Sequence, residues 1–291
     1  MNIQWYPGHM TKTRRQIEAD MGQVDMVAEI IDARIPISSR NPDIDAICAG
    51  KPRLIVLNRA DQADPEGNRA WEKYFRGKGY AVMETDAKTG KGVGQFSAAS
   101  RELLREQIER WRAKGLVGRP VRAMVVGVPN VGKSTFINQV AKRKSAKAGD
   151  RPGVTRGKQW VTVDQGLSLL DTPGILWPKF EDEEVGLHLA YTGAVKDDIM
   201  DVETLACRLM DDMAKRYPGA LRERYKVEVP SKAEGMDPVA YGYELLQAAA
   251  AKRGFRISGG DVDTERMAHI LLDELRGGKL GRFTLEMPEE S

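Results

Sequence analysis

The chain has 291 residues, of which 41% are hydrophobic and 30% charged, and its net charge is only +3. This composition allows one large domain or two, and it excludes a chain that is a polycation along its whole length. No run of about 18 apolar residues and no signal-type segment occurs, so we expect a cytoplasmic protein without membrane insertion. The cysteines, Cys48 and Cys207, are far apart and predict neither a disulfide framework nor a metal site.

The first 120 residues have the pattern of strands that alternate with helices. A segment that mixes aromatic and basic residues, 1–15, comes first, and Thr11 is a candidate cap for a helix through Ile17 and Met21. Short apolar runs rich in β-branched residues predict buried strands, and the segments between them predict helices. The predicted strands are 24–32, 53–57 and 80–84, and the predicted helices are 43–49, 66–78 and 93–114.

Polar residues follow the second and third of these strands. Asn58-Arg59-Ala60-Asp61 has the N-x-x-D spacing of a guanine-specificity motif, at a strand end where α/β sheets bind ligands. The Asp61 carboxylate would accept two hydrogen bonds from guanine, Asn58 would tie this loop to a phosphate-binding loop, and Arg59 replaces the usual lysine. Thr85, Asp86 and Ala87 resemble the S-A-K loop, in which the Ala87 N–H would contact the guanine oxygen.

Residues 127–134 have the form G-x-x-x-x-G-K-[ST] of a P-loop, between a predicted strand, 121–126, and a helix from Thr135. Backbone N–H groups and the positive helix N-terminus would hold the phosphates. Lys133 would reach the β- and γ-phosphates and serve catalysis, and the Ser134 hydroxyl would bind Mg²⁺. The nucleotide contacts expected here are Asn130, Val131, Gly132, Lys133, Ser134 and Thr135.

Two switch-like segments follow the P-loop. Thr155, in a Pro-Gly-Val-Thr sequence, resembles the first switch of translation-type GTPases and would close on Mg²⁺ and the γ-phosphate. The runs 159–163 and 167–170 predict a hairpin that ends at the D-x-x-G sequence 171–174. There Asp171 would hold Mg²⁺ through water and the Gly174 N–H would touch the γ-phosphate.

The remainder of the chain is helical in pattern, with no convincing strand. Helices are predicted at 184–191, 201–217, 237–252 and 264–276, so we divide the chain into domains 1–180 and 181–291. Basic residues cluster in both parts, which favours RNA binding, although any one cluster could be a solvated face. The clusters are Lys12–Arg15, Lys142–Lys158, Arg216 to Lys226, and Arg276 to Arg282.

The motifs run specificity loop, P-loop, switches, whereas an ordinary GTPase begins with the P-loop. Circular permutation produces such an order when the original termini are close together. The sequence therefore predicts an α/β fold: a circularly permuted P-loop GTPase domain with a mostly parallel sheet flanked by helices, followed by a smaller all-α domain.

The rotated motif order, the N-terminal segment from Gln4 to Arg15 and the Asp32-Ala33-Arg34-Ile35-Pro36 sequence resemble the ribosome biogenesis GTPase A family over essentially the whole chain. The resemblance implies a GTPase with a low intrinsic rate that binds rRNA late in large-subunit assembly and is stimulated by the ribosomal particle. It also implies a K⁺ ion held in part by Asn130. Ile175 stands where many GTPases have a catalytic glutamine, and the resemblance points to His9 as its replacement.

The expected cofactors are Mg²⁺ and K⁺, and the expected partners are GTP, GDP and the large ribosomal subunit with its rRNA, for a chain that is monomeric off the ribosome. One alternative is a GTPase switch that acts on a protein unrelated to ribosomes. An ATP-using enzyme is disfavoured by Asn58 and Asp61. A non-enzymatic RNA-binding factor is disfavoured by the intact Lys133, Ser134, Thr155 and Asp171.

Overall fold

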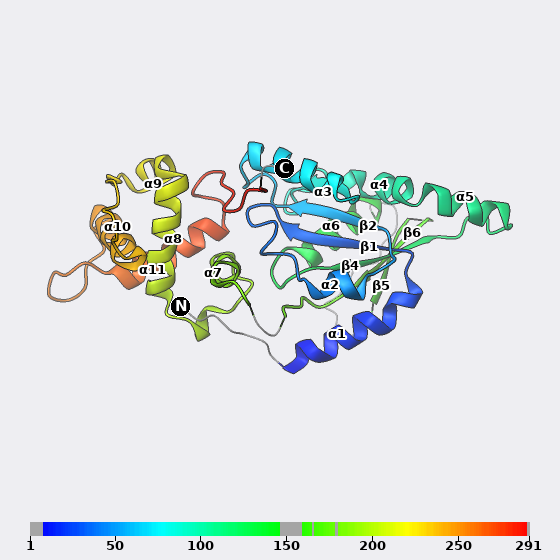
Figure 1. Ribbon diagram of the computed structural model, residues 1–291, viewed down its shortest axis with the longest axis horizontal. Helices are drawn as coiled ribbons and strands as arrows, with labels where there is room; N and C mark the ends of the chain where they lie inside the picture. The colour runs from blue at the N-terminus through cyan, green and yellow to red at the C-terminus, as the bar shows by residue number, and fades with distance from the viewer. Residues whose placement is uncertain (1–7, 146–158, 165, 178–179, 290–291) are drawn as a thin grey trace. The chain divides into compact units, whose positions relative to one another are not determined.

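The computed structural model describes residues 8–145, 159–164, 166–177 and 180–289. These residues form two compact units (Figure 1). The first contains the described residues up to 177 together with 286–289, and the second contains 180–285. The chain therefore leaves the first unit after the second switch motif and returns to it close to the C-terminus.

The first unit is built on a six-stranded sheet with the order β3-β2-β1-β4-β6-β5. Every neighbouring pair is parallel except β5 with β6. The strands are β1 (Met26–Asp32), β2 (Arg53–Asn58), β3 (Ala81–Thr85), β4 (Val121–Val126), β5 (Gln159–Asp164) and β6 (Leu167–Asp171). The strand that precedes the P-loop is therefore central, with the specificity strands on one side and the switch strands on the other.

Both faces of this sheet are covered. Val27 and Ile31 of β1 belong to apolar clusters completed by α1 and α2 and by α3, respectively. Ala28 and Ile30, which alternate with them, are equally buried. The helices of this unit are α1 (Gly8–Asp20), α2 (Asp43–Ile47), α3 (Pro65–Gly77), α4 (Phe96–Leu103), α5 (Arg105–Ala113) and α6 (Lys133–Ser145), with 3-10 turns η1 (Met21–Gln23) and η2 (Val93–Gln95).

Two predicted helices differ from the structure. The segment 93–114 is not one helix, because Leu104 leaves helical geometry (φ −104°, ψ 15°) and separates α4 from α5. The Leu104 side chain is buried there, which a continuous charged helix face did not indicate. Helix α1 begins at Gly8, three residues before the predicted cap Thr11.

The carboxyl ends of the parallel strands meet at one edge of the sheet. Asp32 at the end of β1 is in register with Asn58 at the end of β2, which is in register with Thr85 of β3. On the other side of β4, Val125 is in register with Asp171. This edge is where parallel α/β sheets bind ligands, and it brings together segments that are far apart in the sequence.

In the part of the second unit that the structure describes, α8 is the central helix and contacts α7, α9, α10 and α11. The closest crossing is at Gly242 of α10, where a Cβ would lie 1.8 Å from the Cys207 carbonyl oxygen of α8. Only glycine permits this approach. The helices are α7 (Glu183–Tyr191), α8 (Val202–Arg216), α9 (Pro218–Tyr225), α10 (Pro238–Lys252) and α11 (Thr264–Arg276), with a 3-10 turn η3 (Asp197–Ile199).

The return of residues 286–289 to the first unit differs from the predicted domain division, which assigned everything after 180 to one helical domain. The physical reason is a set of hydrogen bonds at one residue. The Glu286 carboxylate accepts from the backbone N–H groups of Ile37 and Ser38, and its carbonyl oxygen accepts from Trp71 Nε1 at 2.8 Å.

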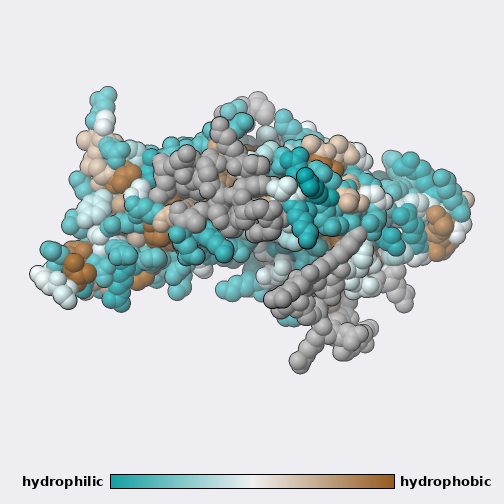
Figure 2. Space-filling view, turned by 90° about the horizontal axis from the view of Figure 1, so that it is seen from below, coloured by the Kyte–Doolittle hydropathy of each residue, from teal (hydrophilic) through white to brown (hydrophobic). Residues whose placement is uncertain are grey.

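The surface drawn in Figure 2 is mostly hydrophilic over the coloured residues, with hydrophobic residues in small, separate groups. Among the described helices, none combines the length and the apolar character that crossing a membrane requires.

Candidate nucleotide-binding site

The P-loop connects the end of β4 to the start of α6. Gly132 has φ 104°, and a Cβ at this position would lie 2.4 Å from the side-chain nitrogen of Asn58. Asn130 adopts φ 58°, a left-handed conformation that asparagine tolerates better than most residues. The loop is therefore shaped both by its own backbone and by the specificity loop pressed against it.

Lys133, the first residue of α6, is buried, and its ammonium group donates to the carbonyl oxygens of Gly127 at 3.0 Å and Val128 at 2.8 Å. Burial lowers the pKa of Lys133 to about 8, against the opposing effect of the Asp171 carboxylate. A phosphate group would offer this cation a full negative charge in place of two carbonyl dipoles. The side chain is thus poised to exchange loop contacts for phosphate contacts.

The surroundings of Asp171, at the end of β6, show whether a magnesium ion would fit at this site. Its Oδ1 atom is buried and has no hydrogen-bond partner in the part of the chain that the structure describes. Burial raises the pKa of Asp171, and the Lys133 ammonium partly offsets this. A hard cation that takes carboxylate and hydroxyl oxygens would satisfy this atom, with Ser134 exposed at the start of α6 as the second ligand. The residues present therefore fit Mg²⁺.

The D-x-x-G segment lies directly against the P-loop. A Cβ at Gly174 would lie 2.7 Å from the Pro129 backbone and 2.9 Å from Lys133 Nζ. The next residue, Ile175, donates its backbone N–H to the Gly127 carbonyl oxygen at 3.3 Å. Any side chain at position 174 would have to displace the P-loop or its lysine, so this contact needs glycine.

Asn58 joins three loops. Its side-chain nitrogen donates to the Val131 carbonyl oxygen of the P-loop at 2.9 Å. Its side-chain oxygen accepts from the Thr85 hydroxyl at 3.2 Å and from the Ala87 N–H at 3.0 Å. Asn58 is 3% exposed, so these bonds are shielded from water and fix the two specificity loops on the phosphate-binding loop.

Known proteins share this arrangement over the whole chain. Residues 122–224 match a family model described as "50S ribosome-binding GTPase". The ribosome biogenesis GTPase A of Bacillus cereus is 48% identical over 291 residues, covering 100% of this chain and 95% of that protein. The chain belongs to the ribosome biogenesis GTPase A family. The protein of the same name from Thermotoga maritima is 30% identical over 288 residues, covering 99% of this chain and 95% of that protein.

Solved structures agree with this assignment. The GDP-bound structure of YlqF is 26% identical with a TM-score of 0.63, and covers 95% of this chain and 100% of that chain. GNP-bound YlqF from T. maritima is 27% identical with a TM-score of 0.62, covering 96% of this chain and 100% of that chain. The predicted fold, a circularly permuted GTPase domain with a helical C-terminal region, is confirmed. The chain is a GTP-hydrolysing enzyme, and its GTPase class generally requires Mg²⁺.

The three residues predicted to recognise the base, Asp61, Asp86 and Ala87, have different surroundings in the structure. Asp61 is exposed in the loop between β2 and α3, where its carboxylate is accessible to a base. Asp86 instead accepts from the backbone N–H groups of Lys88 at 2.9 Å and Thr89 at 3.2 Å, and so shapes its own loop. The Ala87 N–H, expected to contact guanine, donates to Asn58, so a guanine oxygen would compete with that bond.

Arg59, which replaces the usual lysine, bridges the specificity loop and the P-loop. Its backbone has φ 60°, its Nη2 donates to the Asn130 carbonyl oxygen at 2.9 Å, and its Nε lies 3.6 Å from the Asp32 carboxylate. Asp32 also holds Arg34 through two side-chain bonds of 2.9 and 2.7 Å. Burial would raise the pKa of Asp32, but the two guanidinium groups hold it below its usual value.

The ion pair between Asp32 and Arg34 was not deduced from the sequence. Arg34 is 0% exposed, which is rare for an arginine and requires a partner of opposite charge. The signal available was the position of Asp32 at the end of a buried strand, beside the specificity strand. Asn41 was missed as well, and its side-chain nitrogen contacts the Ile175 carbonyl oxygen at 3.4 Å.

The side chains of two predicted catalytic residues lie outside the part of the chain that the structure describes. His9 lies in the first turn of α1, and its side chain is outside the described part. Thr155 lies outside the described residues altogether. The predicted residues that the structure does bring together at the sheet edge are Asn58, Arg59, Thr85, Ala87, Asn130, Val131, Gly132, Lys133, Asp171 and Gly174.

Proposed function

We propose that this chain is a GTP-hydrolysing assembly factor that binds rRNA and the large ribosomal subunit during late maturation. The observation that carries the proposal is the junction at Asn58, which fixes guanine-specificity loops on a P-loop. Relatives named ribosome biogenesis GTPase A match the chain from end to end, which supports the ribosomal role. In this proposal the protein acts as a monomer off the ribosome, in the cytoplasm where ribosomes assemble.

We infer roles in GTP binding for residues of the specificity loop, the P-loop and the switch motifs. Asp61 selects guanine, and Arg59 and Asn58 keep the base loop against the P-loop. Lys133 moves from the Gly127 and Val128 carbonyl oxygens to the β- and γ-phosphates. Ser134, Asp171 and Thr155 would hold Mg²⁺, and the ion would supply positive charge that neutralises charge developing on the phosphates. Val131, Gly132, Thr135 and Gly174 offer their backbone N–H groups.

Hydrolysis requires a group that orients the attacking water. Ile175 is 1% exposed and belongs to the apolar cluster with Val24, so it cannot perform this role. His9, at the start of α1, is the residue proposed to do so. A His9→Ala variant is expected to lose particle-stimulated turnover while it retains GDP affinity. Full stimulated turnover in this variant would remove His9 from the mechanism.

Asn130 is the proposed K⁺ ligand. Its side chain is exposed on the P-loop, its backbone is left-handed, and its carbonyl oxygen accepts from Arg59 Nη2. A monovalent ion near the phosphates would supply charge where other GTPases use an arginine finger. Turnover should therefore be faster in K⁺ than in Na⁺ at equal ionic strength, and equal rates would exclude this role.

The experiment that tests the function is co-sedimentation with large ribosomal subunits in a GTP analogue and in GDP, with turnover measured alongside. We expect tighter association with the analogue and faster turnover with subunits present. ATP should not compete for the site, because adenine lacks the donor pattern that Asp61 reads. Equal sedimentation in both nucleotides and no stimulation by subunits would contradict the proposal.

A further inference from the structure

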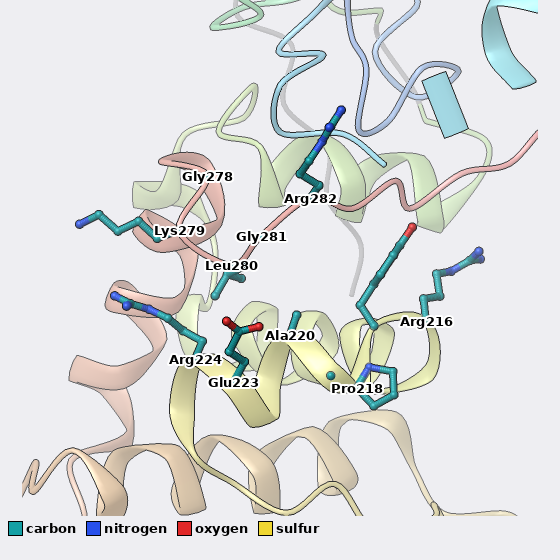
Figure 3. A pocket seen from close by; sticks show the side chains of 12 residues that line it. Arg216, Pro218, Ala220, Glu223, Arg224, Gly278, Lys279, Leu280, Gly281 and Arg282 are labelled. Carbon is teal, nitrogen blue, oxygen red and sulfur yellow. The ribbon is translucent and has the colours of Figure 1, made fainter. Parts of the chain in front are cut away.

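Two basic clusters that are far apart in the sequence line one groove within the helical unit. The groove has a volume of about 750 Å³ and lies between the junction of α8 and α9 and the segment that follows α11 (Figure 3). Its charged and aromatic lining residues are Arg216, Tyr217, Glu223, Arg224, Lys279 and Arg282. The first four come from the α8–α9 region and the last two from the segment after α11.

The charge of this lining is strongly positive. Four cationic side chains and one carboxylate give a net charge of +3, equal to the net charge of the whole 291-residue chain. Arg224 is partly neutralised, because its guanidinium donates to Glu274 at 3.0 and 2.5 Å. Arg216 and Lys279 are exposed, and neither forms an ion pair with another described residue. No ion pair with a described residue therefore neutralises the charge of Arg216 or Lys279.

The walls of the groove are held in position by bonds between its two segments. The Tyr217 hydroxyl donates to the Thr284 carbonyl oxygen at 3.0 Å and accepts from the Thr284 N–H at 2.9 Å. The Arg224–Glu274 pair connects α9 to α11 in the same way. A preformed site loses little conformational freedom when a ligand binds, and this favours affinity.

We propose that this groove binds the sugar–phosphate backbone of RNA, an inference that rests on the function proposed above. Arg216, Lys279 and Arg282 neutralise successive phosphates at the rim. Glu223 points into the groove between them, as Figure 3 shows. A carboxylate in this place repels a compact polyanion but accepts a hydrogen bond from a ribose 2′-hydroxyl, which DNA lacks. The groove therefore prefers RNA to DNA.

The first test removes two positive charges, those of Arg216 and Lys279, that form no ion pair with other described residues. The double variant Arg216→Gln/Lys279→Gln is compared with Arg222→Gln/Lys252→Gln, whose residues are exposed in the same unit but do not line the groove. Fluorescence anisotropy of a labelled 12-nucleotide oligouridine is measured on the full chain between 50 and 200 mM KCl. Two lost phosphate contacts should reduce the slope of log K against log salt by about 1.4 in the groove variant. Equal slopes in the two variants would overturn the proposal.

The second test blocks the groove without disturbing the fold. A Cβ at Gly219 would meet nothing within 4 Å, and this residue lies in the first turn of α9, where a carboxylate stabilises a helix. Gly219→Glu should therefore weaken RNA binding while the circular dichroism and melting temperature are kept. Unchanged RNA affinity in a folded Gly219→Glu protein would contradict the assignment.

The third test asks whether Glu223 makes the groove prefer RNA to DNA. Glu223→Ala should lower the ratio of RNA to DNA affinity, and an unchanged ratio would exclude the 2′-hydroxyl contact. A phosphoserine peptide of equal charge that competes as well as RNA would show that the groove takes another class of ligand. If wild-type protein fails to bind oligouridine yet hydrolyses GTP and sediments with subunits, the groove proposal fails alone. If the wild-type protein does not sediment with large subunits, and subunits do not stimulate its GTP turnover, the proposed function is contradicted instead.

Discussion

The carboxylate of Glu286 binds Ser38, a residue 248 positions earlier in the chain, through its backbone N–H at 3.0 and 3.1 Å and through its hydroxyl. The same loop after β1 carries Asn41, which contacts the Ile175 carbonyl oxygen beside the D-x-x-G motif. The helical unit is therefore joined to the GTPase unit at two places in the sequence. One connection follows the second switch, and the other ends at Glu286.

Removal of this anchor should destabilise the loop to which it binds. A hydrogen bond to a charged group contributes a net of about 1.5–3 kcal/mol, and Glu286→Ala leaves the Ile37 and Ser38 N–H groups without this acceptor. We expect the free energy of unfolding of the GTPase unit to fall by about 2 kcal/mol. Hydrogen exchange of the Ile37 and Ser38 amides should accelerate. Glu289→Ala, an exposed carboxylate three residues later, serves as the control and should change neither quantity.

Asn58→Asp should weaken nucleotide binding because it replaces a donor by an acceptor. The variant would place a carboxylate oxygen against the Val131 carbonyl oxygen, which now accepts from Asn58 at 2.9 Å. An unmade buried bond costs about 1–3 kcal/mol, so GDP affinity measured by calorimetry should fall about 5- to 150-fold. Asn138→Asp, on the exposed face of α6, should retain wild-type affinity. Equal affinities in the two variants would show that the Asn58 junction does not support binding.

Asp32→Asn should be among the most destabilising single changes in the GTPase unit. It leaves Arg34, which is 0% exposed, without its counter-charge, and removes the carboxylate beside Arg59. Breaking a buried ion pair from one side costs about 3–5 kcal/mol, whereas an exposed pair contributes about 0–1 kcal/mol. The surface pair Glu72–Arg76 provides the matched control through Glu72→Gln. Similar losses of unfolding free energy in urea for the two variants would refute this reading of Asp32.

Much of the sheet could be predicted because each strand is indicated by the pattern of neighbouring residues in the sequence. A mostly apolar run with β-branched residues before a P-loop predicts a buried strand, and β4 spans the same residues in the structure, Val121–Val126. The permuted topology followed from the motif order, and it is confirmed by the sheet order and the family. The guanine motif placed Asn58 beside the P-loop, because strand ends of a parallel sheet share one edge.

What could not be predicted depends on contacts between distant residues. The break at Leu104 requires knowledge of what its side chain packs against, and helical periodicity continued across it. The bond from the Ala87 N–H to Asn58 depends on which acceptor is nearer in three dimensions. The return of Glu286 to Ser38 and Trp71 has no composition signal, since a single glutamate in a C-terminal segment is ordinarily solvated.

The buried Lys133 makes nucleotide binding dependent on pH. Burial lowers the pKa of its ammonium group to about 8 in the absence of nucleotide, so at pH 9 most of the protein carries it neutral. Phosphate oxygens favour the charged form, which raises the pKa in the complex, so binding must take up a proton above pH 8. GDP affinity should therefore decrease by up to tenfold per pH unit above about 8 and be independent of this group well below it.

Proton uptake can be measured directly by calorimetry of GDP binding at pH 9 in buffers of different ionisation enthalpy. The slope of the observed enthalpy against the buffer enthalpy gives the number of protons bound, which should approach one at pH 9 and vanish near pH 6.5. The variant Asp171→Asn provides a second comparison, because the Asp171 carboxylate raises the pKa of Lys133. In that variant the onset of uptake should move to lower pH. Uptake that is absent at pH 9 in the wild type would mean that Lys133 is already charged before the phosphates arrive.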